Sequence, residues 1–231
     1  MARRKWTYLL LVRIPFWWIV TSILLVLLLK WVPVRYTPVM LKRAFQFRKV
    51  ENLRSEQVWV PLEKVSPEIV QAVIAAEDSR FLLHKGFDRV ELEKMWKEHE
   101  EKGRKIRGCS TISQQTAKNV FTFGSRSWVR KGLEVYWTVL IEWIWGKRRI
   151  MEVYLNVIET GKGLYGVEAA SRHYYDKSAA KVDRKQAVAI AACLPSPLRE
   201  TPTRPSARAS ARRNRIMRQL PLPEKLRKLP E

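Results

Sequence analysis

Residues 66–78 read SPEIVQAVIAAED, and this stretch predicts a helix that is buried on most of its sides. Ser66 suits the N-cap, Pro67 the first helical position and Glu68 the first turn, so we expect the helix to begin at Pro67. The run 69–76 then carries no charge until Glu77. Such a helix belongs to the core of a helical domain.

Two adjacent carboxylates, Glu77 and Asp78, close this helix. A carboxylate there meets the negative end of the helix macrodipole, so we expect the pKa of Glu77 to rise. Arg80, Phe81 and His84 follow directly. A carboxylate with apolar neighbours and a flanking histidine is typical of a proton acceptor. A plain surface charge at a helix end explains this single feature equally well.

The first 34 residues predict a membrane anchor. Residues 14–29 contain no charge, and their apolar flanks extend the run to roughly the 20 residues that a bilayer span requires. Four basic residues precede the span, which places the N-terminus in the cytoplasm and the rest of the chain outside, although Lys30 and Arg35 weaken this bias. The alternative is a cleaved signal peptide, but no small-residue cleavage site follows.

The charge of the chain points to an anionic partner. Its 231 residues include 44 Lys and Arg against 22 Asp and Glu, a formal net charge of +22. Nucleic acid, a phospholipid surface and a phosphorylated substrate all fit, but the basic residues are dispersed, which disfavours nucleic acid. Cys109 and Cys193 are too few for a disulfide scaffold, and the three histidines are too scattered for a zinc site.

Composition divides the rest of the chain into three parts. Residues 35–57 form a basic juxtamembrane segment, which lies against anionic head groups or is a solvated linker. Residues 58–220 form the main domain, with a highly charged lobe or loop region at about 87–107. Residues 221–231 are expected to be a flexible tail. No strand alternation and no repeat is visible, so the fold class is mainly α.

Three helices are predicted late in the domain, at 149–158, 183–194 and 206–220. A longer one, 128–145, is apolar except for a stripe of Glu134, Thr138 and Glu142, so we expect it to be buried everywhere else. Within it, Arg130 and Glu134 are one turn apart and can form an intrahelical ion pair. Because an unpartnered carboxylate on a buried helix is costly, Glu134 is expected to line a cavity.

The string GCSTISQQTAKN, residues 108–119, predicts an anion site. Thr111 and Gln114 have the spacing of a capping box, so a helix begins here with unpaired backbone N–H groups. Thr111, Gln115 and Lys118 share one face of that helix. A hydroxyl, an amide and an ammonium in line suit a phosphate, whereas the simpler interpretation is a capped helix with a polar surface.

Five strings occur in order: EDSRFLLHKG (77–86), GCSTISQQTAKN (108–119), RKGLE (130–134), RRIMEVYLN (148–156) and GLYGVEAASRHYY (163–175). They closely resemble the motifs of the peptidoglycan glycosyltransferases of glycosyltransferase family 51, which include the N-terminal domains of class A penicillin-binding proteins and the monofunctional biosynthetic transglycosylases. The resemblance covers roughly residues 58–217. Cys109 stands where the family commonly has Gly, and Arg148 where it has Lys. No penicillin-binding motif follows, so the chain is expected to be monofunctional.

The resemblance implies a mainly α fold, a lysozyme-like helical head with a small membrane-proximal jaw at about 87–107, preceded by one N-terminal transmembrane helix. It implies that Glu77 is the general base and Glu134 a second catalytic carboxylate. The residues implied for binding substrate and pyrophosphate are Asp78, Phe81, His84, Ser110, Thr111, Gln114, Gln115, Lys118, Asn119, Arg130, Lys131, Tyr154 and Asn156.

The implied reaction polymerises lipid II into glycan strands and releases undecaprenyl pyrophosphate. The implied partners are lipid II, the growing glycan chain, membrane lipids and other cell-wall synthases or division proteins, at the outer, periplasmic side of a bacterial inner membrane. A divalent cation, Mg²⁺ or Mn²⁺, is the one cofactor left open. Two alternatives remain: a lytic muramidase that cleaves finished glycan, and a non-enzymatic basic membrane protein.

Overall fold

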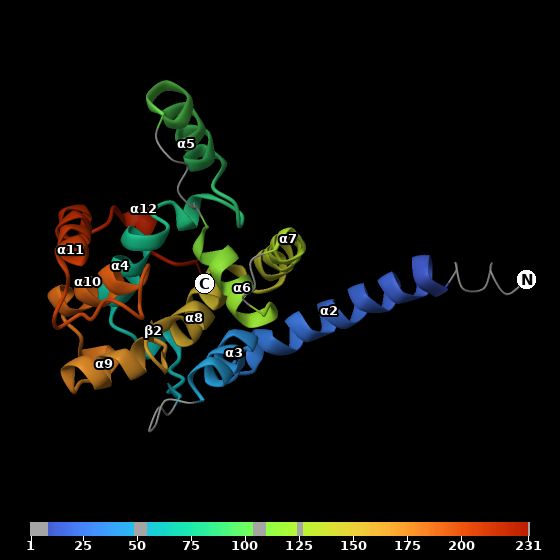
Figure 1. The fold of residues 1–231 in the computed structure, drawn as a ribbon, viewed down its shortest axis with the longest axis horizontal. Helices are drawn as coiled ribbons and strands as arrows, with labels where there is room; N and C mark the ends of the chain where they lie inside the picture. The colour runs from blue at the N-terminus through green and yellow to red at the C-terminus, as the bar shows by residue number, and fades with distance from the viewer. Residues whose placement is uncertain (1–8, 49–54, 104–109, 124–126, 231) are drawn as a thin grey trace, which may run out of the picture.

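The computed structural model describes residues 9–48, 55–103, 110–123 and 127–230. Within these ranges the chain is mainly helical, which confirms the predicted fold class. One long helix, α2, extends away from a body formed by the other helices (Figure 1). Cys109 lies outside the described residues.

The extended helix is α2 (Ile14–Trp31), preceded by a π-helical turn, η1 (Leu9–Arg13). Residues Leu11–Trp31 are long and apolar enough to cross a membrane, with a mean hydropathy of 2.1. Only 11% of this segment is buried against the rest of the protein, so its apolar side chains are available to lipid. The predicted anchor is therefore present as one N-terminal apolar helix.

The C-terminal half of α2 contacts the body. The Trp145 indole Nε1 donates a hydrogen bond to the Val26 carbonyl at 2.7 Å, and Val26 is fully buried. Arg149 Nη2 donates to the Leu29 carbonyl at 2.8 Å. The apolar helix is thus packed against the body of the molecule and is not joined to it by the chain alone.

The core surrounds α4 (Pro67–Glu77), which packs against α10 (Arg184–Cys193) and α11 (Ala207–Gln219). Ser66 caps α4, since its hydroxyl accepts a hydrogen bond from a backbone N–H of the first turn. Every residue of Ile69–Ala75 is buried. Both the predicted start of this helix and its buried character are confirmed.

A second layer consists of α6 (Ile112–Phe121) packed against α7 (Trp128–Ile144) and α8 (Gly146–Val157). The predicted capping box is present: the Thr111 hydroxyl accepts from the Gln114 N–H, and the Gln114 side chain accepts from the Thr111 N–H. This cap fixes the residue at which α6 begins.

The exposure of α7 differs from the prediction: its polar stripe is buried, and part of its apolar surface is exposed. Glu134 and Thr138, on the polar stripe, are buried with 2% and 0% exposure, whereas Trp128 and Trp143 are 92% and 75% exposed. The expectation that this helix is buried except along its stripe is therefore wrong. The stripe faces α6 and the protein interior, while the apolar face lies on the outside of a helix that packs beside α2.

A small sheet, which the sequence did not predict, has the strand order β1-β3-β2. β1 (Glu56–Gln57) is parallel to β3 (Leu164–Tyr165), and β2 (Glu159–Gly161) is antiparallel to it. Strands of two or three residues are too short to show an alternating pattern. Gly166, at φ +81°, then turns the chain into α9 (Val167–Tyr175). Glycine is required at this turn, because a side chain there would meet the backbone of Asn156 in α8.

The charged region 87–107 contains a helix, α5 (Arg89–Lys102), rather than a loop. Asp88 caps its N-terminus, and Gly103, at φ +59°, ends it. No residue of α5 itself is buried, and the helix projects from the body (Figure 1). This is the position of the expected jaw.

The C-terminal segment 221–231, expected to be a flexible tail, differs from that expectation within its described part. Leu222 is buried, and its backbone N–H donates to Gln71 Oε1 of α4 at 3.2 Å. The burial of Leu222 could not be predicted, because so short a segment shows no pattern of apolar residues. The remaining short elements are α3 (Pro38–Phe47), η2 (Leu62–Lys64), η3 (Phe81–Leu83), η4 (Ala179–Lys181) and α12 (Glu224–Arg227).

Candidate active site

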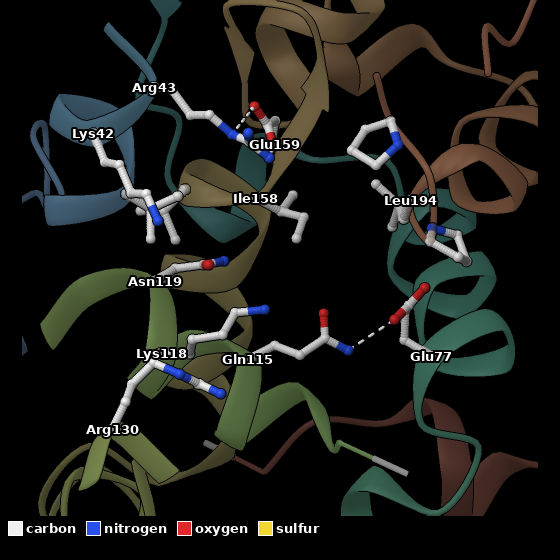
Figure 2. A pocket seen from close by; sticks show the side chains of 14 residues that line it. Lys42, Arg43, Glu77, Gln115, Lys118, Asn119, Arg130, Ile158, Glu159 and Leu194 are labelled. Atoms are coloured by element: carbon white, nitrogen blue, oxygen red, sulfur yellow. Dashed lines mark hydrogen bonds and ion pairs between the residues drawn. The ribbon is translucent and has the colours of Figure 1, made fainter. Parts of the chain in front are cut away.

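A cavity of about 450 Å³ opens at the C-terminal end of α4, between α3, α6 and the loop that follows α10 (Figure 2). Its size is in the range of small-molecule sites. Cationic side chains outnumber carboxylates in its lining, which suits an anionic ligand. The charged and polar residues of the lining are Lys42, Arg43, Glu77, Gln115, Lys118, Asn119, Arg130 and Glu159.

Glu77 presents one free carboxylate oxygen to this site. Its Oε2 accepts a hydrogen bond from Gln115 Nε2 at 2.7 Å, whereas Oε1 is buried and has no hydrogen-bond partner among the described residues. Burial raises the pKa of Glu77, while the Gln115 hydrogen bond and the Lys118 charge act in the opposite direction. A desolvated carboxylate with an unused oxygen can accept a proton.

The amide of Gln115 is oriented from behind by Tyr154. The Tyr154 hydroxyl donates to Gln115 Oε1 at 3.4 Å, which leaves the Gln115 amide group to donate to Glu77 and, at 3.3 Å, to the Ser110 carbonyl. Complete burial raises the pKa of Tyr154 well above its ordinary value, so the phenol stays protonated and remains a donor. Tyr154 is fully buried behind Gln115 and lines neither of the two cavities that contain Glu77.

Asp78 joins the end of α4 to the start of α6. Its Oδ2 accepts from the Ile112 backbone N–H at 3.0 Å, and its Oδ1 lies 2.9 Å from His84 Nε2. Both partners are buried or nearly so. These bonds hold Glu77 and Gln115, which belong to different helices, at a fixed separation.

The same residues form the one group with metal-ligand spacing in the described part of the chain, Asp78, His84 and Asp88. Their ligand atoms are already used by protein donors: Asp78 by His84 and the α6 backbone, and Asp88 by Arg80 at 3.1 Å. Only His84 Nδ1 has no hydrogen-bond partner among the described residues, and the group lies outside the lining of the cationic cavity.

Lys118 and Arg130 form the cationic wall of the cavity (Figure 2). Burial lowers the pKa of Lys118, and the Glu134 and Glu77 carboxylates partly oppose this. Arg130 Nη1 donates to Glu134 Oε2 at 2.7 Å, and Lys131 Nζ donates to Glu134 Oε1. Glu134 is not part of the lining of this cavity: its carboxylate is buried and pairs with Arg130 and Lys131.

A second cavity lies on the other side of Glu77, toward α5. Glu77 and Gln115 line both cavities, so the Glu77 carboxylate lies where the two cavities meet. This arrangement allows two ligands to approach one proton acceptor from opposite sides. The second cavity is polar and contains charges of both signs, with a lining that includes Asp78, Asp88, Glu91, Lys94, Ser110, Thr111 and Arg215.

Comparison with known proteins identifies the family of this chain. The sequence pattern of the Transglycosylase family matches residues 45–221. The chain belongs to this family. It is 49% identical to a biosynthetic peptidoglycan transglycosylase of Bacteroides thetaiotaomicron over 86% of this chain and 80% of that protein. Proteins of the same name from Caulobacter vibrioides (49%, 83% of this chain and 81% of that one) and Bdellovibrio bacteriovorus (48%, 93% and 84%) are equally similar.

The transglycosylase fold brings together most of the residues predicted for the site and leaves others outside both cavities. Phe81 is fully buried, with Lys147 Nζ 4.4 Å from its ring centre. Asn156 uses its side chain to bond both backbone groups of Val60, at 2.8 Å each. These two residues, with His84, Gln114 and Lys131, support the site through packing, capping or ion pairs and do not line it.

Sequence reasoning missed the residues that α3 brings to the transglycosylase site. Lys42 and Arg43 line the cavity, as does Glu159, but the first two precede the matched range. A local signal for this helix existed. Thr37 precedes Pro38, and its hydroxyl accepts from a backbone N–H of the first turn. Where that helix docks depends on contacts distant in sequence, which no local pattern reports.

Proposed function

We propose that this transglycosylase polymerises lipid II, with Glu77 as the general base. The observation that carries the proposal is the position of Glu77 Oε1, buried and unpartnered between a cationic cavity and a second polar cavity. The donor would occupy the cationic cavity with its pyrophosphate. The acceptor would place its sugar 4-hydroxyl at Glu77 from the other side.

In this mechanism Glu77 Oε1 takes the proton of the acceptor hydroxyl as that oxygen attacks C1 of the donor sugar. The C1–O bond to pyrophosphate breaks on the opposite face, so the configuration at C1 inverts. Gln115 holds the other carboxylate oxygen and so directs Oε1 at the incoming hydroxyl. General base catalysis of this kind contributes about 10²- to 10⁴-fold.

The leaving group departs as an anion and needs charge rather than a proton. Lys118, which burial has deprived of water, and Arg130 would stabilise the developing charge on undecaprenyl pyrophosphate. Glu134 prevents Arg130 from turning away. Glycan hydrolysis would instead require an acid to protonate a sugar leaving group and would have no need of the cationic wall.

We further propose that α2 crosses the membrane with its N-terminus in the cytoplasm and the catalytic domain on the outer side. The exposed apolar face of α7, which includes Trp128, Val139 and Trp143, would then lie against the bilayer beside α2. A substrate with a polyprenyl tail meets a membrane-bound enzyme at a high effective concentration. The net charge of +22 favours anionic lipid and pyrophosphate alike.

The test is polymerisation of fluorescent lipid II by the purified full-length protein in detergent, with parallel incubation on purified peptidoglycan sacculi. We expect glycan polymer from lipid II, no soluble fragments from sacculi, and no polymer with Glu77→Gln. Fragments released from sacculi without lipid II turnover would identify the muramidase alternative and refute the proposal.

A further inference from the structure

A separate cavity of about 540 Å³ lies where the chain leaves the apolar helix α2, between α3 and the segment that contains β1. Its size is in the range of small-molecule sites. It shares no lining residue with the two cavities that contain Glu77, so the proposed reaction does not use it. Its apolar lining consists of Met40, Leu41, Ala44, Val58 and Trp59.

Contacts of the protein place this cavity beside the end of α2. Gln57 Nε2 donates to the Val34 carbonyl at 3.0 Å, which joins β1 to the chain just after the apolar helix. The Arg149 guanidinium, which binds backbone carbonyls at the end of α2, lies 5.1 Å from the centre of the Trp59 ring. Figure 1 shows α3 next to this end of α2. In the proposed orientation the cavity is therefore at the outer surface of the bilayer, where phospholipid head groups lie.

Arg35 gives this cavity an unpaired positive charge. It is exposed, and among the described residues it is the one charged member of the lining. Its side chain makes no ion pair or hydrogen bond with the described residues. Nearby arginines are already paired, Arg43 with Glu159 and Arg149 with Glu152. The guanidinium of Arg35 can therefore offer its N–H groups to a phosphate.

The cavity opens on an apolar outer face. Tyr36, Leu41 and Val58 line it and are 81%, 51% and 43% exposed. Phe45, one turn after Leu41 on α3, is 73% exposed on the same side of the helix. Exposed aromatic and aliphatic side chains beside a free arginine are typical of a membrane interface. This combination is complementary to a lipid that has an acyl chain and an anionic head group.

Helix α3 separates this cavity from the site of the reaction. Three of its side chains line the cavity near α2, whereas Lys42 and Arg43 of the same helix line the catalytic cavity. A polyprenyl tail in the cavity near α2 would lie across α3 from the pyrophosphate that Lys118 and Arg130 are proposed to hold. The position thus favours a lipid of the bilayer over the tail of the substrate.

We propose that this cavity binds one anionic phospholipid of the bilayer, with the head-group phosphate on Arg35 and an acyl chain among the apolar side chains. The inference rests on the proposed membrane crossing of α2 but not on the proposed reaction. Because α3 has the lipid on one side and the catalytic cavity on the other, the bound lipid would help to hold Lys42 and Arg43 in position.

The experiment uses native mass spectrometry of the full-length protein in a neutral detergent. It measures the fraction of protein that retains one lipid as phosphatidylglycerol or phosphatidylcholine is added. Phosphatidylglycerol should bind about tenfold more tightly, as expected for a charge-assisted hydrogen bond. Arg35→Ala should remove this preference and leave phosphatidylcholine binding unchanged. Ala44→Trp should weaken binding of both lipids, because the larger side chain fills the cavity.

Arg48→Ala is the matched control, since Arg48 is an exposed arginine at the end of α3 and does not line the cavity. It should keep the wild-type affinity for both lipids. Arg35 and Ala44 are exposed, so their variants should keep the wild-type melting temperature. Wild-type phosphatidylglycerol affinity in both Arg35→Ala and Ala44→Trp would assign the bound lipid to the surface of α2 and overturn the inference.

Farnesyl phosphate, a short polyprenyl anion, forms a second arm of the titration. If Ala44→Trp weakens binding of farnesyl phosphate but not of phosphatidylglycerol, the cavity holds the substrate tail and the inference is wrong. The titration contains no lipid II. Absence of lipid II turnover in the wild-type protein would therefore refute the proposed function, while the titration would still decide whether the cavity binds a phospholipid.

Discussion

Replacing Glu77 with glutamine should abolish turnover and at the same time stabilise the folded protein at neutral pH. The amide keeps the shape of the side chain and can still accept the Gln115 hydrogen bond of 2.7 Å. Loss of the base should reduce the rate about 100- to 10,000-fold, or about 3 to 5 kcal/mol of transition-state stabilisation. The assay is the initial rate of fluorescent lipid II polymerisation in detergent.

The stability change follows from the pKa of Glu77, which burial raises. The folded state therefore binds this proton more tightly than the unfolded state, so stability falls as the pH rises through the raised pKa, and the full cost persists above it. Glu77→Gln lacks this cost. Its melting temperature should exceed that of the wild type at pH 8, and the difference should close below about pH 3, where the carboxyl is protonated in both states.

Glu68→Gln is the matched control. Glu68 lies on the same helix, outside both cavities, and pairs with Arg184 at 2.7 Å near the surface. This variant should retain wild-type turnover. The reasoning is refuted if Glu77→Gln polymerises lipid II within tenfold of the wild-type rate, or if it melts below the wild type at pH 8.

Three further outcomes are expected. Lys118→Ala should lower kcat about 10²- to 10³-fold, whereas Lys64→Ala on η2 should not, and equal rates in both would remove Lys118 from the site. Gln115→Ala should move the acidic limb of the pH profile of kcat/KM to higher pH, because the Gln115 hydrogen bond lowers the pKa of Glu77. An acidic limb that does not move would argue against Glu77 as the titrating base. Trp143→Asp on α7 should weaken binding to lipid vesicles about tenfold or more. Trp96→Asp on α5 should weaken it less, since α7 and not α5 packs beside α2. A larger loss of vesicle binding in Trp96→Asp than in Trp143→Asp would place the second membrane contact on α5.

Local signals in the sequence were sufficient for the helices that carry the chemistry. Ser66 and Pro67 set the start of α4, and the Thr111 and Gln114 capping box set the start of α6. Each signal depends on hydrogen bonds within four residues, so it can be recognised in the sequence before the fold is known. The position of Glu77 at the end of a buried helix followed from them.

Other features depend on what surrounds an element. A helix with one polar stripe was expected to be buried along its apolar faces, but α7 packs beside a membrane helix, so its apolar face points outward and Glu134 points in. Asn156 and Phe81, predicted to bind substrate, lie outside both cavities, and the contacts that hold them there are with residues distant in sequence. The docking of α3, which brings Arg43 to the site, has the same cause.

Arg149, in the first turn of α8, bonds the carbonyls of Leu29 and Val32 at 2.8 and 2.7 Å, where the apolar helix ends. From Arg149, α8 runs to Val157, about 12 Å along the helix axis, at the edge of the catalytic cavity. In the proposed orientation, the height of Glu77 above the bilayer is therefore set by a rigid helix and not by the length of the segment that connects α2 to α3. Lengthening that segment would leave the height unchanged as long as Arg149 keeps its contacts. Because a polyprenyl tail holds each pyrophosphate at the membrane surface, this fixed height selects which bond of the substrate reaches the carboxylate.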